Sequence, residues 1–228
     1  MKTMRLGLWV ALPAFVLAAA VSSANADLTA TITLSDGYGN TNGGEFMAAY
    51  ADLPFVPVGL PDAPPGQFET FCIETNETIS FGATYYADVA TAADHGGPDN
   101  GPNPLSPLAA YLYAEFIMGQ LAGYTYDVSG GPAARAASAD ALQHVVWFIQ
   151  NQEAKTWNDG DGSLMDQFYQ NASANATNDI GDVRVLVLFD DAAATTPRQD
   201  QLVLTPEPAS LLLGGLGPIV LAWARRRA

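Results

Sequence analysis

The chain has 228 residues, of which 49% are hydrophobic and only 14% are charged, and its nine basic and 24 acidic residues give a formal net charge of −15. This hydrophobic fraction supports a packed core and excludes wholesale disorder. The negative charge argues against nucleic acid as a partner, because few side chains are available to neutralise phosphates. A single cysteine excludes a disulfide framework and a cysteine-based zinc site.

The beginning of the chain has the pattern of a secretory signal peptide. Two basic residues precede an apolar run over 6–21, and Ala24 and Ala26 provide the small side chains of a cleavage site. We therefore expect residues 1–26 to be removed, so that the mature protein begins at Asp27. The alternative is an uncleaved N-terminal anchor.

The next part of the chain has strand patterns separated by loops. Alternation of apolar and polar residues predicts a half-buried strand over Leu28–Ser35. Short apolar runs predict strands over Phe68–Thr75 and Ala83–Ala90, with Gly82 in the turn between them. Clusters of Gly, Pro and Asn predict loops over Gly37–Gly44, Leu53–Gly66 and Thr91–Pro107.

Helical periodicity follows over Leu108–Leu121, Ser138–Gln152 and Ser163–Ala174, with Ser138 as the predicted N-cap of the second helix. Asp182–Asp190 reads as an edge-capable strand, and Gln201–Thr205 as a last strand. Strands at both ends with helices between them predict one α+β domain over 27–205. We expect an antiparallel sheet or sandwich-like core with two or three inserted helices.

This predicted domain is strongly acidic. It contains 23 of the 24 acidic residues of the chain, and its basic residues are Arg135, Lys155, Arg184 and Arg198. Such a surface repels anionic lipids and anionic polymers. The simplest interpretation is solubility in an extracellular setting.

The lone cysteine, Cys72, needs an explanation in an exported protein. It could be a buried apolar residue, a nucleophile, or a thiol capped by something other than a second cysteine. Gln143 is a candidate cap, because a thiolate can attack its amide carbonyl and expel ammonia to leave a Cys–Gln thioester. The reaction needs rigid elements and an apolar surround. Neighbours that could supply this surround are Phe71, Ile73, Leu142 and Trp147.

Two segments resemble the thioester domains of bacterial surface adhesins, namely Phe71-Cys72-Ile73 and Leu142-Gln143-His144-Val145-Val146-Trp147. The intervening Ala110-Tyr111-Leu112-Tyr113 is also similar to that family, whose usual residue at the place of Val145 is Ala. The resemblance spans Phe68–Gln152 and implies a thioester between Cys72 and Gln143. Trp147 and His144 would support it, with His144 as a base for the incoming nucleophile. The implied activity is single-use capture of an amine or hydroxyl group on a surface.

A cysteine hydrolase, in which His144 or His95 serves Cys72, is the least favoured alternative, because no local cysteine-protease pattern accompanies the cysteine. We therefore expect no enzymatic turnover. We also expect no cofactor and no metal. Asn158–Ser163 lacks the spacing of an EF-hand loop and reads as a polar turn.

The end of the chain, residues 206–228, has three parts. Pro206-Glu207-Pro208 precedes an apolar run over 209–224, and Arg225-Arg226-Arg227 closes the segment. As a helix rising about 1.5 Å per residue, the run would extend roughly 24 Å, slightly less than a hydrocarbon core. The arginines would stay on the cytoplasmic side.

This combination resembles the PEP-CTERM sorting signal of Gram-negative bacteria. The resemblance implies export through the inner membrane, transient retention by the C-terminal hydrophobic helix, and recognition and removal of the tail by an exosortase. It further implies delivery to the cell surface or extracellular matrix, in association with exopolysaccharide and biofilm. The alternative is an ordinary tail anchor.

These patterns predict an exported surface or matrix protein that adheres through Cys72 and Gln143. The alternative function is a non-covalent structural or carbohydrate-binding protein of the exopolysaccharide matrix, in which Cys72 is free or buried.

Overall fold

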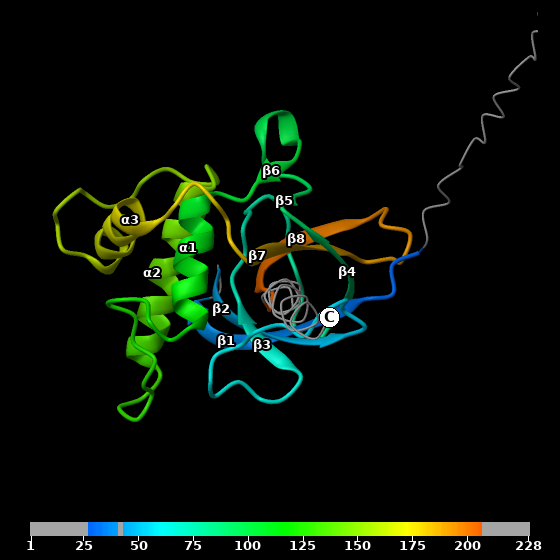
Figure 1. Cartoon of the computed structure of the whole chain (residues 1–228), viewed down its shortest axis with the longest axis horizontal. Coiled ribbons are helices and arrows are strands. Elements are labelled where there is room, and N and C mark those ends of the chain that lie inside the picture. Colours follow the sequence, from blue (N-terminus) through cyan, green and yellow to red (C-terminus); the bar gives the residue numbers. More distant parts are fainter. Residues whose placement is uncertain (1–26, 41–42, 207–228) are drawn as a thin grey trace, which may run out of the picture.

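The computed structural model describes residues 27–40 and 43–206 (Figure 1). The predicted signal peptide, the apolar run over 209–224 and the terminal arginines therefore lie outside the described residues. Among the helices in the described part of the chain, none has the length and apolarity needed to cross a bilayer.

Six strands form one antiparallel sheet in the order β3-β2-β1-β4-β7-β8. Within the first hairpin, the register between β1 and β2 shifts between Ser35 and Tyr38. The strands are β1 (Thr31–Asn40), β2 (Gly43–Ala51), β3 (Gln67–Thr70), β4 (Thr84–Ala90), β7 (Val183–Phe189) and β8 (Pro197–Leu204).

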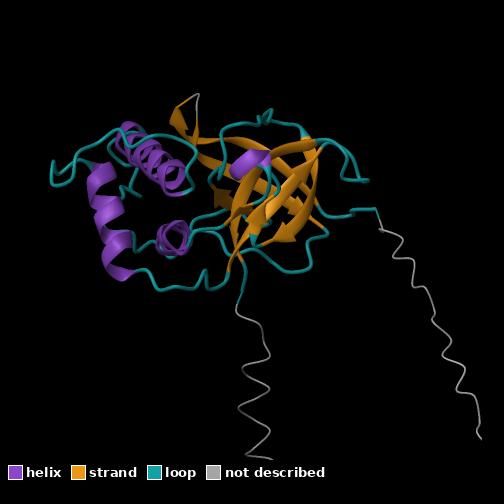
Figure 2. Cartoon of the chain, turned by 90° about the horizontal axis from the view of Figure 1, so that it is seen from above, coloured by secondary structure: helices purple, strands orange, loops and turns teal. Residues whose placement is uncertain are grey.

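The two outer strands of this sheet meet, so that the sheet closes on itself. The segment that follows β3 pairs with β8 through an antiparallel bridge between Cys72 and Gln201. Next to this bridge, the backbone N–H of Leu202 donates to the carbonyl of Phe71 over 3.0 Å. Figure 2 shows the strands curled around a common centre, with the helices to one side. Cys72 thus lies on the seam of the closed sheet.

Three helices form a layer beside the closed sheet: α1 (Pro107–Ile117), α2 (Ala133–Ile149) and α3 (Leu164–Asn175). The hydroxyl of Ser106 accepts a hydrogen bond from Leu108 N and caps α1, and that of Ser163 accepts from Asp166 N and caps α3. The loop before α1 contains the short strands β5 (Ala92–Ala93) and β6 (Asn103–Pro104) and the 3₁₀ turn η1 (Pro98–Asn100).

Side chains alternate between two apolar clusters across the closed sheet. Its interior holds Ile32, Phe68, Leu186 and Cys72 among others, whereas Phe71 and Ile73 point the opposite way, toward the helices. β7 contributes side chains to both clusters, because its residues are buried on both faces of the sheet. The segment that contains Cys72 is therefore enclosed from both sides.

The prediction of an α+β fold with an antiparallel sheet and two or three helices is confirmed, and the helices are three, but the sheet closes on itself and does not form a sandwich. The predicted strands over Phe68–Thr75 and Ala83–Ala90 overlap β3 and β4, which are not neighbours in the sheet. The predicted edge strand is β7, which is central, because β4 and β8 pair with it on either side.

Two local predictions are wrong. The loop expected over Gly37–Gly44 instead forms the end of β1 and the beginning of β2, and the following strand was not predicted. Ser138 is not an N-cap, because α2 begins at Ala133. Its hydroxyl lies inside the helix, where it donates to the carbonyl of Ala134 and accepts from the backbone N–H of Thr125.

Candidate functional site

The side chain of Gln143 reaches from α2 to the backbone of Cys72. The Nε2 of Gln143 donates to the Cys72 carbonyl over 2.7 Å, and the backbone N–H of Cys72 donates to Oε1 over 3.1 Å. The carboxamide thereby pairs with this segment as a neighbouring strand would. Both residues are 1% exposed. The two candidate thioester residues are thus brought together in a water-excluded position.

A second backbone donor converges on the same carboxamide oxygen. The N–H of Gly44, in β2, points to Oε1 of Gln143 at 3.4 Å, so that this oxygen faces two N–H groups. Two preorganised donors on one carbonyl oxygen are the arrangement that stabilises negative charge in acyl transfer. Such donors would polarise the carbonyl of Gln143 for nucleophilic attack at its carbon.

Close approach of α2 to β2 depends on a missing side chain at Gly43. A Cβ atom placed there would lie 2.6 Å from Cη2 of Trp147 and 2.8 Å from Cγ of Gln143. Gly43 also has a φ of +146°, which other residues rarely adopt. Glycine at this position therefore lets Gln143 and Trp147 enter the end of the closed sheet.

The thiol of Cys72 points into the interior of the closed sheet, where Nε2 of Gln201 donates to Sγ over 3.6 Å. Burial, and to a smaller extent the nearby Glu74 carboxyl, raises the pKa of the thiol to about 12. Cys72 is therefore protonated at neutral pH. External reagents also have little access to it.

Buried carboxyl groups lie next to the seam. Burial and then the charge of Asp200 raise the pKa of Glu74 to about 9, and burial raises that of Asp200 to about 7. Glu74 Oε1 accepts from the backbone N–H of Asp200 over 3.1 Å, whereas its Oε2 has no partner among the described residues. Glu74 is thus a buried, protonated carboxyl two residues from Cys72.

The two histidines contact other groups. Nδ1 of His144 lies 2.9 Å from a carboxylate oxygen of Glu153, and the imidazole packs edge-on against Trp147. Nδ1 of His95 lies 3.5 Å from Glu77. Neither histidine has a described hydrogen bond to Cys72. The described residues contain no cluster of His, Cys, Asp and Glu that could hold a metal ion.

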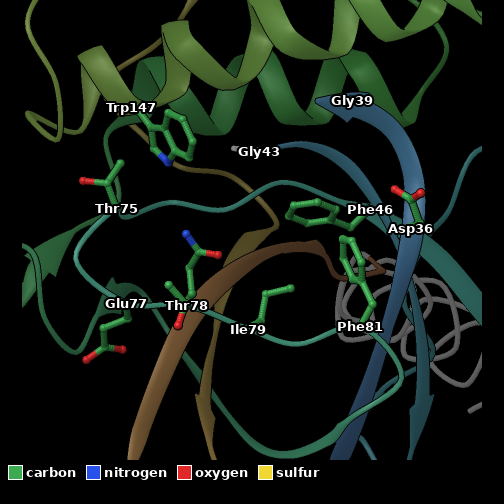
Figure 3. A pocket seen from close by; sticks show the side chains of 11 residues that line it. Asp36, Gly39, Gly43, Phe46, Thr75, Glu77, Thr78, Ile79, Phe81 and Trp147 are labelled. Atoms are coloured by element: carbon green, nitrogen blue, oxygen red, sulfur yellow. The ribbon is translucent and has the colours of Figure 1, made fainter. Parts of the chain in front are cut away.

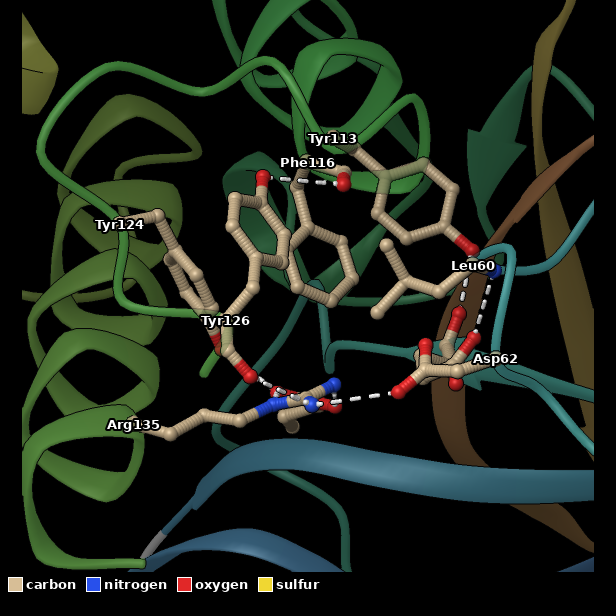
Figure 4. A network of polar contacts seen from close by, with 9 residues as sticks. Leu60, Asp62, Tyr113, Phe116, Tyr124, Tyr126 and Arg135 are labelled. Carbon is tan, nitrogen blue, oxygen red and sulfur yellow. Dashed lines mark hydrogen bonds and ion pairs between the residues drawn. The ribbon is translucent and has the colours of Figure 1, made fainter. Parts of the chain in front are cut away.

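A buried polar network fixes α2 against β2 two turns before Gln143. Arg135 donates to both carboxylate oxygens of Glu45, through Nη2 over 2.6 Å and through Nε over 3.1 Å. The hydroxyl of Tyr124 donates to Glu45 over 2.6 Å, and the guanidinium lies over the ring of Tyr38. Figure 4 shows Arg135 extending below Tyr124 and Tyr126 toward Asp62. This network holds α2 in the register that brings Gln143 to Cys72.

A cleft of about 580 Å³ opens at the end of the closed sheet, next to Trp147 and Gly43 (Figure 3). Phe46 and Phe81 form one wall with edge-to-face packing, at a centroid distance of 5.3 Å. The remaining lining comes from β1, from the loop after β3 and from β8: Asp36, Gly39, Thr75, Glu77, Thr78, Ile79 and Gln199.

Sequence reasoning did not find Gly43, Gly44, Gln201, the Arg135–Glu45 pair or this cleft. The Gly-Gly pair before Glu45 was the only available signal, since glycine inside a strand marks close approach of another segment.

Residues 204–228 match the model of the PEP-CTERM protein-sorting motif. Comparison with curated proteins and with solved structures gives no match. The chain thus carries the motif by which exosortase substrates are sorted, which supports an exported protein with a C-terminal sorting signal. The Pro-Glu-Pro triplet and the terminal arginines that were predicted as the signal lie within the matched residues.

Proposed function

We propose that this protein is an exported surface or matrix protein that adheres by a thioester between Cys72 and Gln143. The observation that carries the proposal is the Gln143 carboxamide, held against Cys72 with two backbone N–H groups on its oxygen. The role is single-use covalent capture of an amine or hydroxyl group and not catalytic turnover. The site of action is the surface or the exopolysaccharide matrix of a Gram-negative cell.

The bond would form by acyl transfer within the folded chain. Sγ of Cys72 attacks Cδ of Gln143, and the carbonyl electron pair moves onto Oε1, which faces the N–H groups of Cys72 and Gly44. When this intermediate collapses, the bond from Cδ to Nε2 breaks. The thiol proton leaves with that nitrogen, and ammonia departs.

A second glutamine competes for the role of acyl donor. Nε2 of Gln201 donates to the sulfur over 3.6 Å, but Oε1 of Gln201 is buried and has no donor among the described residues. Negative charge on that oxygen would be unstabilised, whereas two N–H groups face Oε1 of Gln143. This difference favours Gln143.

The test is the intact mass of the full chain beside its Cys72→Ala, Gln143→Ala and Gln201→Ala variants. All four proteins are processed alike by the host, so a mass difference that is present in some and absent in others reports the thioester. We expect the parent and Gln201→Ala to be lighter than their sequences by one ammonia, and the other two variants to have full mass. Methylamine should then add one molecule to the parent at Gln143.

Full sequence mass in the parent contradicts the thioester. A mass loss that disappears in Gln201→Ala and persists in Gln143→Ala reassigns the acyl donor.

A non-covalent role in the matrix is the second candidate, favoured by the protonated thiol of Cys72 and its hydrogen bond to Gln201. In that case Gln143 fills a gap in the sheet and carries no chemistry. The same mass measurement distinguishes the two candidates.

A further inference from the structure

We propose that the cleft at the end of the closed sheet binds one or two pyranose units of a glycan that carries no acidic groups. The proposal goes beyond the thioester and does not require it. Its basis is the combination of an unpartnered donor, an exposed aromatic wall and a polar lining without positive charge. The volume of the cleft, about 580 Å³, lies within the range of small-molecule sites.

The unpartnered donor is the indole of Trp147. Its side chain comes from α2 and is 5% exposed, and its Nε1 is buried with no hydrogen-bond partner among the described residues. Figure 3 shows the indole nitrogen on the side of the ring that faces Thr78 across the cleft. A buried N–H without a partner is costly, so an acceptor oxygen from a ligand would be stabilising there.

The aromatic wall is the ring of Phe81, which is 50% exposed and packs on Phe46. Among the described residues, Phe81 is the only aromatic side chain with such a large exposed fraction. A flat apolar surface at the edge of a polar cleft matches a pyranose, which presents C–H groups on one face and hydroxyls around its rim.

The polar lining defines the charge of the ligand. Asp36, Glu77, Thr78 and Gln199 supply acceptors and hydroxyl or amide donors, and the lining residues include neither Lys nor Arg. Glu77 also lies beside the buried carboxyl of Glu74 and helps to raise the pKa of that group. An acidic sugar would meet the carboxylates of Asp36 and Glu77 with no Lys or Arg in the lining to offset them. Neutral and amino sugars therefore fit, and uronic acids do not.

The test uses the full chain labelled with 5-fluorotryptophan and followed by ¹⁹F NMR. The chain contains four tryptophans, so the Trp147 resonance is assigned by its loss in Trp147→Phe. The probes are the neutral trisaccharides of glucose, mannose and galactose, the glucosamine trisaccharide and, as an acidic comparison, trigalacturonate. We expect a saturable shift of the Trp147 resonance with a neutral or amino trisaccharide, at a Kd on the order of 1 mM.

Trp157→Phe is the matched control, because Nε1 of Trp157 is also buried and has no hydrogen-bond partner in the described part of the chain, but Trp157 does not line the cleft. Binding to each tryptophan variant is measured by calorimetry. We expect at least tenfold weaker binding in Trp147→Phe and unchanged binding in Trp157→Phe. Because Trp147 packs in the interior, Phe81→Ala is a second variant at an exposed ring, and it should weaken binding by a similar factor.

The proposal is overturned if no neutral or amino trisaccharide shifts the Trp147 resonance at concentrations on the order of 10 mM, tenfold above the expected Kd. Equal binding of trigalacturonate overturns it as well, as does equal weakening in Trp157→Phe. Cys72→Ala separates this proposal from the thioester. That variant cannot form the bond, and we expect it to bind the same trisaccharide as the parent.

Discussion

The substitution Arg135→Met tests whether a buried ion pair fixes α2 against the closed sheet. Arg135 and Glu45 are 3% and 2% exposed, and the pair is bidentate. Methionine keeps most of the side-chain volume but removes the positive charge. The Glu45 carboxylate is then left in the interior, with the hydroxyl of Tyr124 as its remaining side-chain donor.

The expected loss of stability is large, because the remaining charge cannot reach water. Removal of one partner from a buried ion pair costs about 3–5 kcal/mol. For a domain of this size each kcal/mol corresponds to about 2–4 °C, so the Tm should fall by roughly 6–20 °C. Adding Glu45→Gln should restore part of the loss, since an amide in the same place is uncharged.

The assay is thermal and urea unfolding of the full chain, followed by circular dichroism. Arg198→Met is the matched control, because Arg198 pairs with Asp190 at a partly exposed position where an ion pair contributes little. A Tm decrease for Arg135→Met no larger than that of Arg198→Met would refute the reasoning. So would a double variant with Glu45→Gln that is no more stable than Arg135→Met.

Two further predictions concern the surroundings of Cys72. Gly43→Ala should lower the Tm more than Gly66→Ala. Both glycines have positive φ, but only at Gly43 would the new Cβ overlap with Trp147. Equal decreases in Tm would contradict the close approach of Trp147 to Gly43. The pKa of Glu74, raised to about 9, makes its contribution to stability complete below about pH 4.5 and lost as pH rises toward 9. Glu74→Gln should flatten this decrease in urea unfolding between pH 5 and pH 9, and an unchanged slope would show that another group is responsible.

Local sequence signals predicted the helices better than the ends of the strands. Ser163 caps α3, as expected for a serine that directly precedes a helical pattern. The cap is predictable because its hydrogen bond joins residues only three positions apart. Ser138 has the same local signal, but α2 begins earlier and buries Arg135, whose partner Glu45 is distant in the sequence. A local sequence pattern cannot reveal the contact between Arg135 and Glu45, because the two residues are far apart in the chain.

For the candidate site, the residue types were visible in the sequence and their surroundings were not. Cys72 and Gln143 stand out as a lone cysteine and a glutamine in an apolar helix. Both donors to the carboxamide oxygen are backbone N–H groups, from Gly44 and from Cys72. Because nearly every residue has a backbone N–H, the sequence does not mark which of them will act as donors. The position of Gln201 follows from closure of the sheet, which depends on pairing between its outermost strands.

Closure at Cys72 also affects how the protein behaves when it is crowded. An open sheet presents unpaired N–H and C=O groups at its edges, and these recruit strands from neighbouring molecules. Here the segment after β3 and strand β8 satisfy one another at the seam. Densely packed molecules can therefore touch without adding strands to one another. Damage to the seam would convert a self-contained fold into a template for aggregation.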